Sequence, residues 1–299
     1  MTTAIVLLAV NFIQIYGLIY DTRVGFPFKD DLFQYIASIC DVIRLYPLLE
    51  LYSATAYYGV AFAFLAILLI YITLLFVTDY LITTESTKLL TVPVQLLSFL
   101  STVLFWVFMM PIFETYIAIF DCKTGGTHRI DTELECLGGL HIFLCVLFTM
   151  TLAGFLAIFV LIALFFNESR PNHTNALRRL DLSLELYIVM FKFIIVILTH
   201  FLSEYSWQWL LIVAHLVFSS YFSHVWYKYL PYYNIATSVI FGACWINYFW
   251  ISANLLLLKA LEGTNRYQGQ TIVIIIGIIL MFPLTYQIRE RKILSMLYN

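Results

Sequence analysis

Long apolar stretches alternate with short polar segments along almost the whole chain. A helix needs about 20 apolar residues to cross the roughly 30 Å hydrocarbon core of a bilayer. The stretches that meet or approach this length cover residues 3–20, 54–77, 93–120, 139–166, 184–202, 207–227, 235–258 and 271–287. We therefore predict an all-α, polytopic transmembrane helical bundle of about eight spans, forming a single transmembrane domain over residues 1–299.

Two of these stretches depart from a plain crossing. Residues 3–20 have no basic segment before them and no obvious small-residue cleavage site. This favours a retained membrane helix, although a cleaved signal peptide stays open. The third stretch is longer than one straight crossing needs and carries Pro93 and Pro111. We expect that helix to begin in the interface and to kink near its far end.

Residues 32–52 show an amphipathic pattern instead. Their apolar residues recur at helical spacing, whereas the opposite face carries Gln34, Ser38, Asp41 and Arg44. Such a segment is typical of an interfacial helix that lies along the membrane. Because proline lacks a backbone donor, Pro47 should bend or end this helix near Tyr46.

Composition and charge agree with a membrane protein. The chain is 62% hydrophobic and 11% charged, whereas a soluble domain carries about a quarter charged residues. The formal net charge is −2 and no basic block is present, which excludes a nucleic-acid partner. The bilayer is thus the first partner that the sequence predicts.

The basic residues give a weak orientation signal. If the loop between Cys122 and Cys136 faces outward, both termini and most basic residues become cytoplasmic. The cytoplasmic basic residues are then Arg170, Arg178, Arg179, Lys228, Arg289, Arg291 and Lys292. In this orientation the sequons at Asn167 and Asn172 face the cytoplasm and stay unglycosylated. A glycan found at Asn172 would show that the opposite orientation is correct.

Cys122 and Cys136 bracket one polar loop, whereas Cys40, Cys145 and Cys244 lie in apolar segments. In an oxidising compartment the first pair could form a disulfide. The bond would close a loop of about fifteen residues and contribute about 3 kcal/mol. A zinc site that adds His128 or His141, and two free thiols, remain as alternatives. The zinc site lacks CxxC or HxxxH spacing, and we expect no metal.

Four ionisable residues inside the spans form a candidate intramembrane polar site: Glu114, Lys192, His200 and His215. A buried lysine costs a few kcal/mol unless it snorkels, pairs or lines a wet cavity, and Glu185 could pair with Lys192. Glu114 follows Pro111, whose freed carbonyl could help to form a cation site, although a helix–helix hydrogen bond is the simpler interpretation. The histidines could move protons or only be polar groups near the interface.

Neither catalysis nor conduction has a sequence signature here. The chain contains no GxSxG, HExxH, phosphate loop or paired carboxylates at working spacing. It also lacks an arginine ladder, a carbonyl filter sequence and a clear inverted repeat. We therefore expect no enzyme and no cofactor.

Several polar segments carry recognisable motifs. They are GFPFKDD (25–31), DVIRLYPLLE (41–50), FDC with a second cysteine at the end of 120–136, NESRPNHTNALRRLD (167–181), YSWQWLLIV (205–213) and YLPYYN (229–234). In these motifs the chain resembles the membrane region of the tiny macrocysts protein family of ciliates, slime moulds and algae. The resemblance runs from about residue 20 to the end.

This resemblance implies a polytopic module whose relatives usually continue into cytoplasmic regions, often with PAS-type sensory modules. It also implies the Cys122 and Cys136 pair and a cytoplasmic hairpin that holds Arg170, Asn175, Arg178 and Arg179. The sequence stops at Asn299, just after the basic RERK segment. Either a downstream region lies outside this sequence, or the membrane module works alone.

These observations favour a non-catalytic membrane module that assembles with membrane or cytoplasmic proteins, to relay a signal or to anchor a complex. Its contact surfaces would be the loop 167–183 and the C-terminal tail. A homo-oligomer stays open, and we expect the plasma or ciliary membrane rather than an organelle. The alternative is an ion channel or transporter subunit that uses Glu114, Lys192 and the outer histidines.

Overall fold

The fold is described from a computed structural model of the chain. It describes residues 2–19, 31–45, 49, 53–84, 87–123, 126–166, 183–202, 207–229, 234–260 and 270–298. These residues form helices and no named strand, with two isolated β-bridges in the loop between Cys122 and Cys136. The prediction of an all-α helical bundle is therefore confirmed.

Seven helical runs are long and apolar enough to cross a membrane. They are Ala54–Thr83, Leu90–Phe120, Gly139–Leu164, Leu184–Phe201, Gln208–Tyr229, Ile235–Ala260 and Val273–Lys292. The first apolar stretch also forms a helix, α1 (Thr2–Ile19), whose apolar part Ile5–Ile19 is shorter. The multi-pass character predicted from the sequence is thus confirmed, because every predicted stretch contains a helix.

The chain forms two compact units. Unit 1 contains Met1–Ile43 and Asn167–Asn299, and unit 2 contains Arg44–Phe166. The boundary falls at the last residue of the amphipathic helix α2 (Asp31–Arg44). The single transmembrane domain expected from the sequence stays a prediction.

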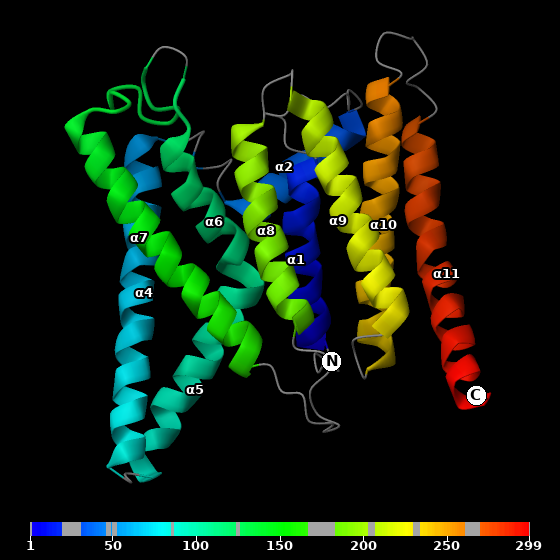
Figure 1. Ribbon diagram of the computed structural model, residues 1–299, viewed down its shortest axis with the longest axis horizontal. Helices are drawn as coiled ribbons and strands as arrows, with labels where there is room; N and C mark the ends of the chain where they lie inside the picture. The colour runs from blue at the N-terminus through cyan, green and yellow to red at the C-terminus, as the bar shows by residue number, and fades with distance from the viewer. Residues whose placement is uncertain are drawn as a thin grey trace. The chain divides into compact units, whose positions relative to one another are not determined.

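Unit 1 is a bundle in which α9 (Gln208–Tyr229) and α10 (Ile235–Ala260) pack along each other. The long helices α1, α8 (Ser183–Phe201), α9 and α10 run side by side, and α11 (Gln270–Tyr298) packs on α10 (Figure 1). Aromatic rings fill its interior; for example, Phe222 stacks on Trp245 with ring centroids 4.3 Å apart. Gly242 lies against the Trp226 indole, where a Cβ has no room.

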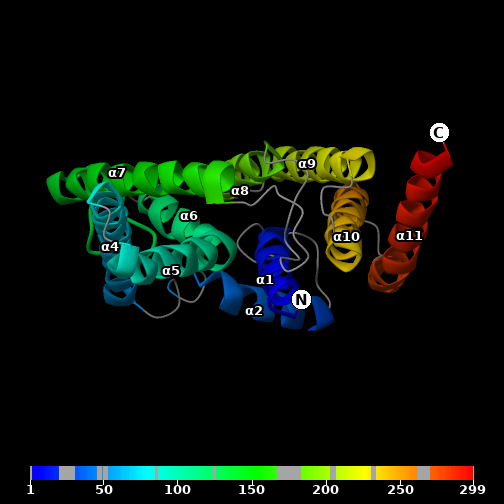
Figure 2. The ribbon, with the colours of Figure 1, turned by 90° about the horizontal axis from the view of Figure 1, so that it is seen from below.

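The amphipathic helix α2 runs across the long helices of unit 1, on the side of α1 that faces away from α8 (Figure 2). This is the orientation expected of a helix that lies along a membrane. The helix ends at Arg44, and Leu45 follows with a left-handed φ of 68°. It therefore ends earlier than the predicted position near Tyr46. The segment around Pro47, and most of the predicted continuation to residue 52, lies outside the described residues.

Unit 2 contains α4 (Ala54–Thr83), α5 (Thr87–Val103), α6 (Met109–Ile117) and α7 (Gly139–Leu161). A π-helical turn, η2 (Leu104–Phe108), joins α5 to α6, and the short 3-10 helix η3 (Ala118–Phe120) follows α6. A second π-helical turn, η4 (Ile162–Phe166), continues α7.

The third span bends visibly between α5 and α6 (Figure 1). Proline cannot donate a backbone hydrogen bond, and its ring crowds the turn before it, so its effect falls N-terminal to the proline itself. The bend accordingly lies at η2, just before Pro111 and near the middle of the span rather than near its far end. Pro93, by contrast, lies inside the continuous helix α5.

Candidate functional site

A buried ion pair between Arg44 and Glu114 lies in the interior of unit 2. Arg44 donates from Nε and Nη2 to Oε1 of Glu114, at 2.9 Å and 2.5 Å. Both side chains are fully buried. The second carboxylate oxygen, Oε2, has no hydrogen-bond partner among the described residues. The pair therefore joins the first residue of unit 2 to α6 of the same unit.

Tyrosine hydroxyls hold α6 in place beside this pair. The Tyr57 hydroxyl donates to the carbonyl oxygen of Thr115 at 2.9 Å, and the Tyr116 hydroxyl donates to that of Ala61 at 2.7 Å. Every residue of Met109–Ile117 is buried. A helix that is buried on all sides is a core element, so Glu114 belongs to a packed interior.

The sequence predicted either a cation site or a helix–helix hydrogen bond for Glu114, and the structure shows a hydrogen bond from another helix, with the charged Arg44 as its donor. Sequence reasoning missed Arg44, because the amphipathic pattern placed it on the polar face of α2 with Gln34 and Asp41. Among the polar residues of α2, Arg44 differs only in that it lies in the last turn of the helix. The pairing itself, over 70 residues of sequence, has no local signal.

Lys192 and His200 lie on α8 in unit 1. Lys192 is fully buried, and its Nζ has no hydrogen-bond partner among the described residues. The snorkelling interpretation is therefore wrong for Lys192, whose ammonium does not reach the surface of the unit. Glu185, also buried, lies seven residues earlier on the same helix, and such spacing places both side chains on one face.

His215 on α9 forms a short hydrogen bond through Nδ1 with the Tyr248 hydroxyl on α10. Both side chains are fully buried. The Tyr248 ring stacks on Tyr16, with centroids 5.8 Å apart, and the Tyr16 hydroxyl donates to the Cys244 carbonyl oxygen at 2.7 Å. His215 is thus part of the contact among α1, α9 and α10. The four predicted intramembrane residues divide between the units, with Glu114 alone in unit 2.

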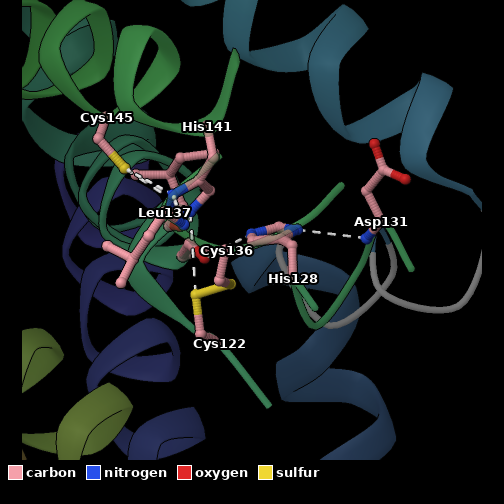
Figure 3. Close-up of a disulfide and its surroundings, with 9 residues drawn as sticks. Cys122, His128, Asp131, Cys136, Leu137, His141 and Cys145 are labelled. Carbon is pink, nitrogen blue, oxygen red and sulfur yellow. Dashed lines mark hydrogen bonds between the residues drawn. A yellow bond between two sulfur atoms is a disulfide. The ribbon is translucent and has the colours of Figure 1, made fainter. Parts of the chain in front are cut away.

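The loop between η3 and α7 contains the predicted disulfide. Cys122 and Cys136 are bonded, with their Cα atoms 6.2 Å apart (Figure 3). The Cys136 amide donates to the Gly126 carbonyl oxygen at 2.7 Å, and bridges join Cys122 to His128 and Thr127 to Glu135. The disulfide interpretation is therefore confirmed over the free-thiol one.

Two histidines bind the carbonyl groups at the end of η3, next to this disulfide (Figure 3). The Leu137 amide donates to Nδ1 of His141 at 3.2 Å, and the Asp131 amide donates to Nδ1 of His128 at 3.2 Å. Each Nδ1 is therefore an acceptor, and the protons lie on Nε2. Nε2 of His141 then donates to Ile119, and that of His128 donates to Ala118, each at 3.0 Å.

This geometry requires neutral imidazoles, because a protonated ring has no acceptor nitrogen. Burial is the main cause that lowers the pKa of His128 below its usual value. His141 thus binds a carbonyl group at the helix end, whereas the Ala118 carbonyl accepts from both His128 and the Asp121 amide. Sequence reasoning named both histidines as alternative zinc ligands but missed this capping role.

Three of the residues that a zinc site would need lie close together. The ligand atoms of Cys122, Cys136 and His141 lie within 4.8 Å of one another. Zinc binds thiolate sulfur, however, and these two sulfurs are bonded to each other. Both ring nitrogens of His141 are also hydrogen-bonded to backbone groups. In the oxidised form the cluster therefore acts as a structural clamp.

The predicted cytoplasmic contact residues Arg170, Asn175, Arg178 and Arg179 lie outside the described residues. The geometry described above defines the class of the protein: an all-α, multi-pass membrane protein with a disulfide-linked loop. Comparison with protein-family models, curated proteins and solved structures finds no match. The resemblance to the tiny macrocysts family thus stays a prediction that rests on its motifs.

Proposed function

We propose that the protein is a non-catalytic membrane module that assembles with partner proteins, to relay a signal or to anchor a membrane complex. The observation that carries this proposal is the buried pair of Arg44 and Glu114. An intramembrane carboxylate is a functional-site candidate by default. Here its charge is already balanced by an arginine of the same unit, which supports a scaffold rather than an ion path.

The surface of unit 2 supports a role inside a bilayer. Large apolar side chains are exposed on three of its helices, among them Phe76 on α4, Phe99 on α5 and Phe143 on α7. Lipid tails are the natural neighbours of such a surface. In this proposal the bilayer is that of the plasma membrane or of a cilium.

The partner surfaces in this proposal are the loop 167–183 and the C-terminal tail. The loop carries Arg170, Asn175, Arg178 and Arg179, which the resemblance to the tiny macrocysts family places in a cytoplasmic hairpin. The tail carries the exposed Arg291 on α11, whereas Arg289 is buried. Paired basic side chains bind acidic partner groups in a fixed geometry.

Native gel electrophoresis of mild-detergent extracts tests the proposal. We expect the full-length chain to migrate in a complex larger than its own mass, and the double variant Arg178→Ala/Arg179→Ala to release it. The matched control, Lys123→Ala, changes a charge in the disulfide loop and should leave the complex intact. A wild-type chain that migrates alone in extracts of its native membrane would contradict the proposal.

A second candidate, an ion channel or transporter subunit, is favoured by Lys192. Its buried ammonium has no hydrogen-bond partner among the described residues, and such groups mark ion or substrate paths in membrane proteins. Liposomes that contain the purified protein separate the two candidates. An ionic current that Lys192→Ala abolishes would establish the second candidate, and silent liposomes would support the first.

A further inference from the structure

Unit 1 contains an apolar pocket of about 280 Å³. Residues of four helices line it: α1, α2, α10 and α11. An apolar cavity of about 150 Å³ holds one benzene molecule. This pocket is therefore large enough for the ring system or chain of a lipid.

The residues of α10 that line the pocket recur at helical spacing, at Cys244, Asn247 and Ile251. Positions three and four apart share one helix face, so the pocket follows a continuous stripe of α10. Asn247 is its amide-bearing residue. The aliphatic and aromatic side chains Ile13, Ile39 and Phe282 surround it from α1, α2 and α11.

Asn247 carries a hydrogen-bonding group that the protein leaves unused. The residue is 3% exposed, and its Oδ1 has no hydrogen-bond partner among the described residues. A buried polar atom without a partner costs about 1–3 kcal/mol. Asn254, one heptad further along α10, shows the contrast, because its Nδ2 donates to the Trp250 carbonyl oxygen at 2.8 Å.

The place of Asn247 along α10 makes water a poor substitute. It lies twelve residues after Ile235, where the helix begins, and thus about 18 Å from that end at 1.5 Å per residue. This is the middle of a candidate span. At such depth the bilayer offers no water to satisfy a polar group.

We propose that this pocket binds a lipid-soluble alcohol, an apolar body with one hydroxyl, and that Asn247 recognises the hydroxyl. A hydroxyl both donates and accepts, so it can donate to Oδ1 and accept from Nδ2 of one amide. The apolar lining accommodates the body of the ligand and excludes more polar molecules. Membrane sterols and long-chain alcohols share this chemistry.

Photolabelling of the purified full-length protein in phosphatidylcholine liposomes tests the proposal. The probes are a photoreactive sterol and a photoreactive long-chain alcohol, each compared with its own methyl ether. We expect at least one free alcohol to label peptides of α1, α2, α10 or α11, about tenfold more than its ether does. The alcohol that labels these peptides more strongly shows whether the ligand is a sterol or a long-chain alcohol.

Asn247→Leu removes the amide while keeping a side chain of similar size. We expect it to lower labelling by the free alcohol about tenfold and to leave labelling by the ether unchanged. The matched control Asn254→Leu changes an asparagine on the same helix outside the pocket and should leave both unchanged. Without added alcohol, Asn247→Leu should melt no earlier than wild type, which separates lost binding from misfolding.

Two results would overturn the proposal. One is equal labelling by the alcohols and their ethers in the wild-type protein. The other is undiminished labelling by the free alcohol in a folded Asn247→Leu protein.

Discussion

Units 1 and 2 differ in the hydrogen bonds of two buried charged side chains, Glu114 in unit 2 and Lys192 in unit 1. In unit 2 the buried Glu114 is paired with Arg44, and the buried hydroxyls of Tyr57 and Tyr116 donate to backbone carbonyls. In unit 1 the Nζ of Lys192 and the Oδ1 of Asn247 are buried without hydrogen-bond partners among the described residues. A polar network with all its hydrogen bonds made rigidifies a core. A buried polar group without a hydrogen bond lowers the stability of the folded state, and such groups are expected mainly at functional sites. The ion pair of Arg44 and Glu114 therefore indicates a structural role, whereas Lys192 and Asn247 are the candidates for a role in binding.

The largest effect is expected from breaking the ion pair of unit 2. Glu114→Leu leaves the Arg44 charge buried alone, which should lower the free energy of unfolding by about 3–5 kcal/mol. Thermal unfolding of the detergent-solubilised protein measures this. The double variant Arg44→Met/Glu114→Leu should recover most of the loss, because an apolar pair of similar volume replaces the ions.

The partly exposed pair of Arg129 and Asp121, 3.4 Å apart, gives the matched control. Arg129→Gln should cost about 0–1 kcal/mol, since such pairs contribute little in water. If Glu114→Leu proved as mild as Arg129→Gln, the structural role assigned to the buried pair would be wrong.

The next effect concerns the covalent link in the loop of unit 2. Cys122→Ser/Cys136→Ser should lower the free energy of unfolding by about 3 kcal/mol, because the reduced loop gains freedom in the unfolded chain. Chemical denaturation measures this difference. Cys145→Ser, which changes a free cysteine of the same unit, is the control and should change stability far less.

For unit 1 the contrast predicts a gain in stability. The double variant Lys192→Met/Glu185→Leu removes a buried ammonium that lacks a hydrogen-bond partner together with the buried carboxylate on the same helix face, so it should raise the free energy of unfolding by about 1–2 kcal/mol. Lys228→Met, at an exposed position on α9, should leave it unchanged within about 0.5 kcal/mol. A loss of stability in the double variant would show that the charged groups of α8 stabilise unit 1 as the ion pair stabilises unit 2, and the contrast between the units would disappear.

The smallest effect is expected from pH. Burial lowers the pKa of His128 from its usual value near 6.5, so the unfolded chain binds a proton before the folded one does. The stability that His128 contributes is complete above pH 6.5 and declines as the pH falls below it. Unfolding curves between pH 8 and 5 measure this, and His128→Gln should make the decline shallower. An equally steep decline in the variant would assign it to other groups.

The sequence predicted what depends on local pattern. Hydropathy located the membrane helices, because about 20 consecutive apolar residues suffice to define a crossing. The cysteines that bracket one polar loop predicted the disulfide between Cys122 and Cys136. Pro111 predicted a bend in the third span, although the bend lies at Leu104–Phe108.

The side-chain contacts of the candidate site depend instead on which helix faces pack against each other in the folded protein. The partner of Glu114 could not be predicted, because an arginine on an amphipathic helix normally faces water and Arg44 is fully buried. The capping role of His141 depends on how the disulfide loop folds back on η3. Asn247 resembles Asn254 in the sequence, and only their surroundings separate a satisfied amide from an unsatisfied one.

The direction in which the Glu114 side chain points depends on the number of residues in the π-helical turn Leu104–Phe108. A π turn holds one residue more than an α-helical turn between bonded groups, and each residue rotates a helix by about 100°. Deleting a single residue there could leave an unbroken α-helix of equal hydropathy whose carboxylate points away from the guanidinium. Insertions and deletions in this turn are thus under a constraint that residue-by-residue substitution would not reveal.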